Sequence, residues 1–148
     1  MNDPRRTLWT LWVIVLAILG VLVAAPTIAG PDPTPYSEAG ASVLGFVLTL
    51  LAMTAGVGSL AVREALLRDI WSGAVDLRSR QGAARVIREM LAAWVLCLVV
   101  AGMGLLLAWA SDRPTLAWPY VLGTLALLAF HAPRTSVIAP SLEATARR

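Results

Sequence analysis

Residues 42–63, SVLGFVLTLLAMTAGVGSLAVR, form a long segment with no charged side chain before Arg63. Its small side chains recur at intervals of three and four residues, which places them on one face of an α-helix. We call this the first small-residue face, and it consists of Ser42, Gly45, Thr49, Ala52, Gly56 and Ser59. The segment is therefore predicted to be a transmembrane helix that packs closely against another helix along this face.

The rest of the chain repeats this absence of charge in segments of similar length. Residues 7–31, 39–62, 90–111 and 114–133 contain no Asp, Glu or Arg. Hydrophobic residues make up 58% of the sequence and charged residues 14%, which is unlike a soluble domain. A helix of about 20 apolar residues crosses the hydrocarbon core of a bilayer. The sequence therefore predicts an all-α membrane protein, a single domain over residues 1–148 that forms an antiparallel bundle of four transmembrane helices.

These four spans are expected at about 8–29, 40–62, 90–111 and 115–133. The arginines then fall on one side of the membrane, with Arg113 as the exception, if both termini are cytoplasmic. That distribution follows the positive-inside rule, so we predict a multi-pass protein of a bacterial inner membrane. Residues 63–89 would form a cytoplasmic elbow into which the second and third helices extend.

The first span also resembles a signal peptide, because Arg5 and Arg6 precede an apolar run. The run is longer than the usual apolar core of a signal peptide, and Thr27 fits the cleavage rule for small residues poorly. We expect a retained helix, with cleavage as the alternative.

The third span carries a second small-residue face. In a bilayer, small side chains allow two helices to approach closely. We therefore predict that the second and third spans form a close antiparallel hairpin along their small-residue faces. The second small-residue face consists of Ala93, Cys97, Ala101, Gly104 and Ala108.

Two Arg–Glu pairs stand at the ends of this hairpin that face the elbow. Arg63 and Glu64 end the second span, and Arg88 and Glu89 precede the third. In an antiparallel hairpin they reach a similar depth, which predicts ion pairs between the helices. Long side chains at helix ends also extend toward lipid headgroups, and this remains the alternative.

Residues 42–109 resemble the hairpin of the rotor c subunit of ATP synthases. Arg80-Gln81-Gly82 stands where that family has its cytoplasmic Arg-Gln-Pro loop, and Met103-Gly104-Leu105 resembles the end of its second helix. The resemblance implies hairpin packing and membership of a ring or association with one. The family's ion-binding carboxylate would fall at Leu98, so the resemblance does not extend to ion translocation.

The sequence shows no pattern of residues that predicts catalysis. No phosphate-binding loop, Ser-His-Asp set or metal-ligand spacing is present, so we expect no enzyme, metal or cofactor. His131 is the only histidine, and one ligand without a second His, Met or Cys partner makes a poor haem site, so we expect an ordinary boundary residue. The arginines do not form a basic polar face, which argues against nucleic-acid binding.

The favoured hypothesis is a non-catalytic structural or accessory subunit that packs in the lipid bilayer as a homo-oligomer or with a membrane-complex partner. A small oligomeric transporter or channel is the first alternative, and a quinone- or haem-associated anchor that uses His131 is the second. A polar path through an oligomer would be lined by the hydroxyl groups of Thr10, Ser42, Thr49, Thr54 and Ser59.

Overall fold

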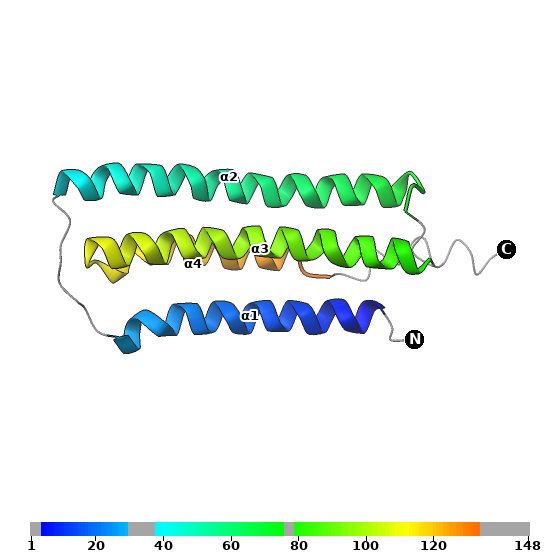
Figure 1. The fold of residues 1–148 in the computed structure, drawn as a ribbon, viewed down its shortest axis with the longest axis horizontal. Helices are drawn as coiled ribbons and strands as arrows, with labels where there is room; N and C mark the ends of the chain where they lie inside the picture. Colours follow the sequence, from blue (N-terminus) through cyan, green and yellow to red (C-terminus); the bar gives the residue numbers. More distant parts are fainter. Residues whose placement is uncertain (1–3, 30–37, 76–78, 134–148) are drawn as a thin grey trace.

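The computed structural model describes residues 4–29, 38–75 and 79–133, and within these ranges it contains α-helices, one 3-10 helix and no strand. The predicted all-α class is confirmed. Helices α2 and α3 run antiparallel, and α3 lies in the middle, in contact with each of the other elements (Figure 1). The elements are α1 (Pro4–Ala29), α2 (Glu38–Trp71), α3 (Arg80–Ser111), η1 (Pro114–Ala117) and α4 (Trp118–Phe130).

Three of these helices are long and apolar enough to cross a membrane, in the segments Arg6–Ala24, Ser42–Trp71 and Gln81–Ser111. The fourth expected span coincides with a shorter apolar segment, Pro114–Phe130, which joins η1 to α4. Helix α2 has 34 residues and is about 51 Å long, whereas a hydrocarbon core is about 30 Å thick. Helices α2 and α3 are therefore longer than a perpendicular crossing requires.

The predicted elbow at 63–89 is largely helical. Helix α2 continues to Trp71, its last residue. Gly73 follows two residues later, and its positive φ of 76° is the conformation that glycine commonly adopts just after a helix C-terminus. Helix α3 begins at Arg80 after an N-cap at Ser79, whose side chain accepts a hydrogen bond from the Gly82 N–H at 2.9 Å. We call this end of the molecule the elbow end and the opposite end the η1 end.

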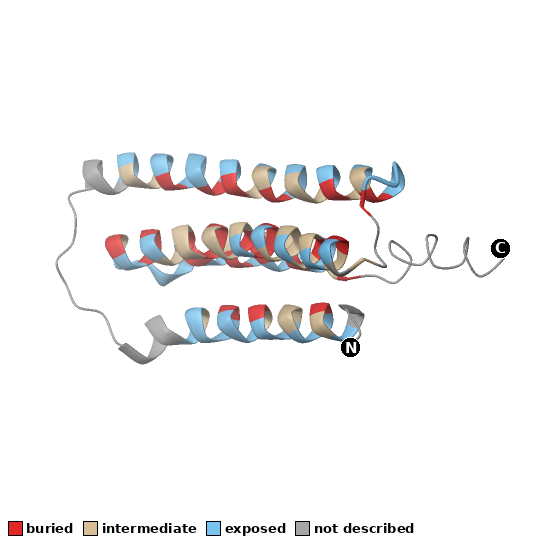
Figure 2. Cartoon of the chain, turned by 45° about the vertical axis from the view of Figure 1, so that its right-hand side comes forward, coloured by how far each residue is buried: buried red, intermediate tan, exposed pale blue. Residues whose placement is uncertain are grey.

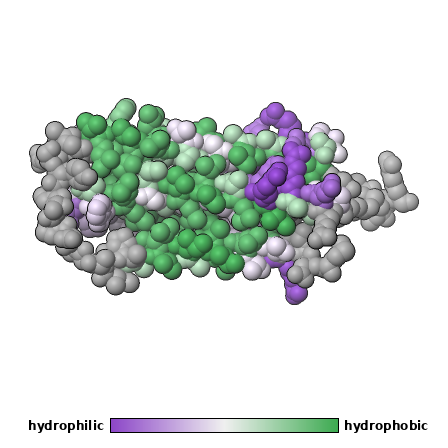
Figure 3. Space-filling model, viewed as in Figure 1, coloured by the Kyte–Doolittle hydropathy of each residue, from purple (hydrophilic) through white to green (hydrophobic). Residues whose placement is uncertain are grey.

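Apolar side chains cover both the inside and the outside of the helices. Figure 2 shows buried residues on the inward sides of α1 and α2 and gathered on α3 and α4. The outer surface is also apolar over most of its length, with hydrophilic residues mainly toward the elbow end (Figure 3). Phe46 and Trp109, for example, are 72% and 70% exposed. Helices that are apolar all round suit a surface in contact with lipid.

Helix α4 approaches α3 most closely at Gly104. A Cβ atom added to Gly104 would lie 2.4 Å from the Cβ and 2.6 Å from the Cγ of Tyr120. Only a residue without a side chain can occupy this position, because the atoms it faces lie at the base of the tyrosine side chain. The same test at Gly102 finds no atom within 4 Å.

Gly104→Ala is therefore expected to lower the free energy of unfolding by about 1–3 kcal/mol, the usual cost of overpacking. Gly102→Ala on the same helix serves as the matched control and should be neutral or slightly stabilising. Thermal unfolding in detergent measures both. Equal effects of the two substitutions would contradict the close contact between α3 and α4.

Candidate functional site

The candidate site is an apolar groove between α2 and α4, with α3 as its floor. Its volume is about 840 Å³. Most of its lining side chains are small or aliphatic, so the helices leave a hollow instead of filling the space between them. The small residues of its two walls are Gly45, Thr49, Ala52 and Gly56 from α2, and Gly123 and Ala126 from α4.

The first small-residue face is the α2 wall of this groove. Two members of this face do not line the groove. Ser42 is exposed, and Ser59 is fully buried about one turn beyond Gly56. A Cβ at Gly45 would meet Leu107 of α3 at 3.5 Å, and one at Gly56 would meet Leu127 of α4 at 3.6 Å. The face therefore looks toward both α3 and α4.

The second small-residue face packs mainly against α4. Its members Ala93, Cys97 and Ala101 are fully buried, and Gly104 and Ala108 are also buried. Helix α4 reaches this face through the Gly104 contact and through the Thr124 hydroxyl, which donates to the Cys97 carbonyl at 3.1 Å. The α2–α3 hairpin is present, but it does not pair the two faces along their length.

The two small-residue faces meet near the middle of α3. Ser59 of α2 lies beside Cys97 of α3 there, and both are fully buried. This contact joins the buried end of the α2 face to the middle of the α3 face. Beyond it, toward the η1 end, the α2 face turns to the groove.

Two hydroxyl groups provide the polar side-chain atoms among the described lining residues. The Thr49 hydroxyl donates to the Gly45 carbonyl at 2.7 Å. The Tyr120 oxygen lies 2.5 Å from the same Thr49 oxygen, whose one proton is already used, so Tyr120 is the donor of this pair. The phenol oxygen of Tyr120 is then able to accept a further hydrogen bond.

Other hydroxyl groups considered for a polar path bind their own helix. Thr10 donates to the Arg6 carbonyl and Thr54 to the Leu50 carbonyl, both at 2.9 Å. Ser59 donates to Gly56 at 2.7 Å. The proton of each of these hydroxyls is used within its own helix, so to donate to a passing solute it would first have to break that hydrogen bond.

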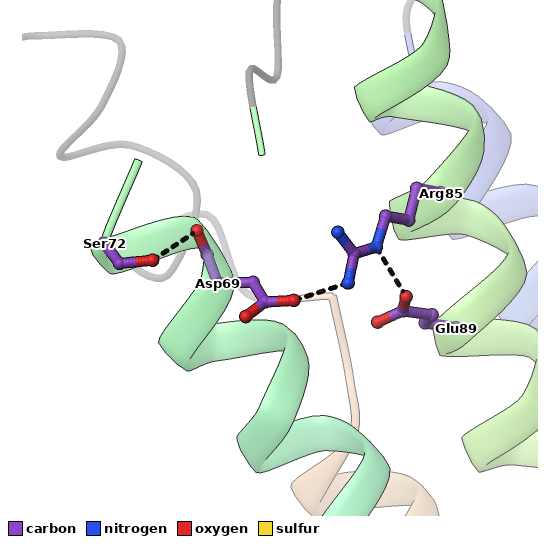
Figure 4. A network of polar contacts seen from close by, with 4 residues as sticks. All are labelled: Asp69, Ser72, Arg85 and Glu89. Atoms are coloured by element: carbon purple, nitrogen blue, oxygen red, sulfur yellow. Dashed lines mark hydrogen bonds and ion pairs between the residues drawn. The ribbon is translucent and has the colours of Figure 1, made fainter. Parts of the chain in front are cut away.

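The ion pair that joins α2 to α3 differs from the predicted one. Arg85 contacts Asp69 across the hairpin at 2.5 Å and Glu89 on its own helix at 2.8 Å (Figure 4). Glu64 pairs instead with Arg68, four residues along α2, at 3.7 Å with both side chains exposed.

The two arginines of the predicted ion pairs, Arg63 and Arg88, point to different faces. The guanidinium of Arg63 lies over the ring of Phe130 on α4, 4.3 Å from the ring centroid. Arg88 is exposed, and nine residues, or two and a half turns, place it on the side of α3 opposite Cys97. The rotation of each helix about its axis sends these two side chains in different directions.

His131 is the C-cap residue of α4, and its side chain is fully buried. Its Nδ1 lies 2.6 Å from the Leu127 carbonyl and its Nε2 lies 3.1 Å from the Ser59 carbonyl of α2. Trp94 of α3 donates its indole N–H to the His131 carbonyl at 3.3 Å. His131 thus ties the end of α4 to α2 and α3, and both of its ring nitrogens face protein oxygens. Within the described residues, no group of three or more His, Cys, Asp or Glu side chains could hold a metal.

Comparison with protein-family models, curated proteins and solved structures finds no match for this chain. The resemblance of residues 42–109 to the rotor c subunit therefore stays a prediction.

The Asp69–Arg85 contact predicts a measurable difference between two conservative substitutions. Asp69→Asn is expected to lower the free energy of unfolding by about 1 kcal/mol or less, because the pair is partly exposed. Glu64→Gln removes only an exposed pair within α2 and should have no measurable effect. Unfolding at low salt measures both, and an Asp69→Asn protein as stable as Glu64→Gln would contradict the role assigned to the contact.

His131→Leu removes both ring contacts and leaves a polar contact between α4 and α2 unmade. We expect it to lower the free energy of unfolding by about 1–3 kcal/mol. Leu125→Ala on the same helix truncates an exposed side chain and is the control for a general effect on α4. If His131→Leu unfolds like the wild-type protein, His131 is not a structural tie.

Proposed function

We propose that this protein is a non-catalytic structural or accessory component of a membrane. We also propose that the groove between α2 and α4 is the surface through which it binds an apolar partner within the bilayer. The observation that carries this proposal is the groove itself, a hollow of about 840 Å³ with small residues on both walls. The partner is the hydrocarbon chain of a lipid or a helix of another subunit.

The physical support comes from packing. An empty apolar hollow forfeits the dispersion contacts of the atoms that line it. In a bilayer those contacts are recovered by whichever hydrocarbon surface fits the hollow, and small residues permit its close approach. Gly56 and Gly123 stand on opposite walls, and neither has a side chain that would obstruct entry.

The membrane arrangement that we propose has four crossings. Segment Pro114–Phe130 has 17 residues, and at about 1.5 Å per residue it is about 25 Å long, close to the thickness of a hydrocarbon core. Helix α4 then provides the fourth crossing of an antiparallel bundle. By the positive-inside rule, the elbow end and both termini lie in the cytoplasm of a bacterium.

The site geometry favours this accessory role over the alternatives. The hydroxyls of Thr10, Thr54 and Ser59 bind their own helices, which weakens the case for a transport path. The ring nitrogens of His131 face carbonyls, which weakens the case for a haem ligand. Leu98 packs against the apolar core, so a link to a rotor ring would be one of packing.

Filling the groove tests the proposal. Gly123→Leu adds a side chain to the groove wall, where an added Cβ has no atom within 4 Å. Gly20→Leu is the matched control, because Gly20 is exposed on α1 and also has nothing within 4 Å. Native mass spectrometry after purification from native membranes in mild detergent identifies what stays bound.

We expect the wild type and Gly20→Leu to retain the same bound lipid or subunit, and Gly123→Leu to lose most of it. Retention by Gly123→Leu would show that the groove is not the binding surface. A wild-type protein recovered as a bare monomer that conducts solute in liposomes would overturn the accessory role.

A further inference from the structure

A charged group lies just beyond the elbow end of the groove. Seven residues are nearly two helical turns, so Arg63 projects from the same side of α2 as Gly56, and Phe130 from the same side of α4 as Gly123. The Arg63 guanidinium lies over the Phe130 ring, 4.3 Å from its centroid, and so reaches from α2 to α4. Arg63 lies seven residues, about 10 Å of helix, beyond Gly56, and Phe130 lies three residues beyond Leu127, so both stand just past the elbow end of the groove.

Arg63 has no carboxylate partner among the described residues. Of the acidic side chains near it, Glu64 pairs with Arg68, while Asp69 and Glu89 both contact Arg85. No acid among the described residues therefore neutralises the positive charge of Arg63. The aromatic ring beneath it restricts the guanidinium without neutralising it.

Polar and apolar groups follow one another along the groove in a definite order. Arg63 stands beyond the elbow end of the groove, the apolar wall at Gly56 and Ala52 follows, and the Thr49–Tyr120 hydroxyl pair comes next. From Arg63 to Thr49 is 14 residues, or about 21 Å of helix. Half of a hydrocarbon core is about 15 Å thick, so one acyl chain of one leaflet fits within this length.

We propose that the groove binds an anionic phospholipid, with its phosphate at Arg63 and one acyl chain along the apolar wall. This proposal rests on the proposed function, because it requires the groove to be a binding surface, and it adds the chemical class of the ligand. A guanidinium forms paired hydrogen bonds with phosphate oxygens. The charge of Arg63 selects the headgroup, and the small residues of the groove admit the chain.

The test uses the full-length protein in nanodiscs or detergent with defined lipids. The two probes are phosphatidylglycerol and phosphatidylcholine with identical acyl chains, and native mass spectrometry counts the lipids retained. Wild-type protein should retain phosphatidylglycerol about fivefold better than phosphatidylcholine, the preference that one arginine at a membrane surface provides. Inorganic phosphate at millimolar concentration should not displace the lipid, because it lacks the chain.

Four variants locate the interaction. Arg63→Gln should reduce phosphatidylglycerol retention to the level of phosphatidylcholine, and Arg63→Lys should keep most of the preference. Arg88→Gln is the control, because Arg88 is exposed on another face, and it should behave like the wild type. Gly123→Leu should lose both lipids.

The outcomes separate this inference from the proposed function. If Gly123→Leu loses both lipids but Arg63→Gln still prefers phosphatidylglycerol, the groove stands as a binding surface and the headgroup site is wrong. If Gly123→Leu retains both lipids, the groove is wrong for both proposals. A polypeptide retained in place of lipid would also overturn the phospholipid as the ligand. Equal retention of the two lipids by the wild type would overturn the selection of charge.

Discussion

The close approach of α4 to α3 is the constraint on which the rest of this structure depends. Tyr120 rests on the backbone at Gly104, and Thr124 donates to the carbonyl of Cys97, so α4 occupies the small-residue face of α3. Little hydrophobic force drives helices together in a bilayer, and contact distance decides which ones pack. A side chain at Gly104 would hold α4 away from α3 and would change the contacts between these two helices.

The groove results from this packing of α4 on the small-residue face of α3. Because α4 takes the small-residue face of α3, the small residues of α2 do not pair with that face along their length. Gly45 and Gly56 instead look toward Leu107 of α3 and Leu127 of α4, with open space beside them. His131 holds α4 and α2 together at the elbow end through the Ser59 carbonyl, and the groove begins beyond that tie.

The prediction of the helices succeeded because it depended on local properties. Uncharged segments indicated where helices lie, and three of the four predicted spans meet the length and hydropathy of a membrane crossing. The periodicity of Gly45, Ala52 and Gly56 correctly placed them on one face, and that face lines the candidate site.

The prediction of the ion pairs between α2 and α3 failed because it depended on the rotation of one helix against the other. Arg63 lies over Phe130 and Arg88 is exposed on the side of α3 opposite Cys97, whereas Asp69 and Arg85 form the cross-helix pair. The sequence shows Asp69 and Arg85 as plainly as the other acidic and basic residues on either side of the elbow. To choose the pair that forms, one must know how each helix is rotated about its axis, and hydropathy does not give this rotation.

The amino-acid sequence alone therefore determined the helices and the two faces of small residues, because charge, length and periodicity are properties of each segment. Only the tertiary structure decided which face meets which helix. That choice follows from the fit of one side chain, Tyr120, against one glycine, Gly104, on a helix that is near in space. Steric fit of this kind arises between segments, and no single segment carries it.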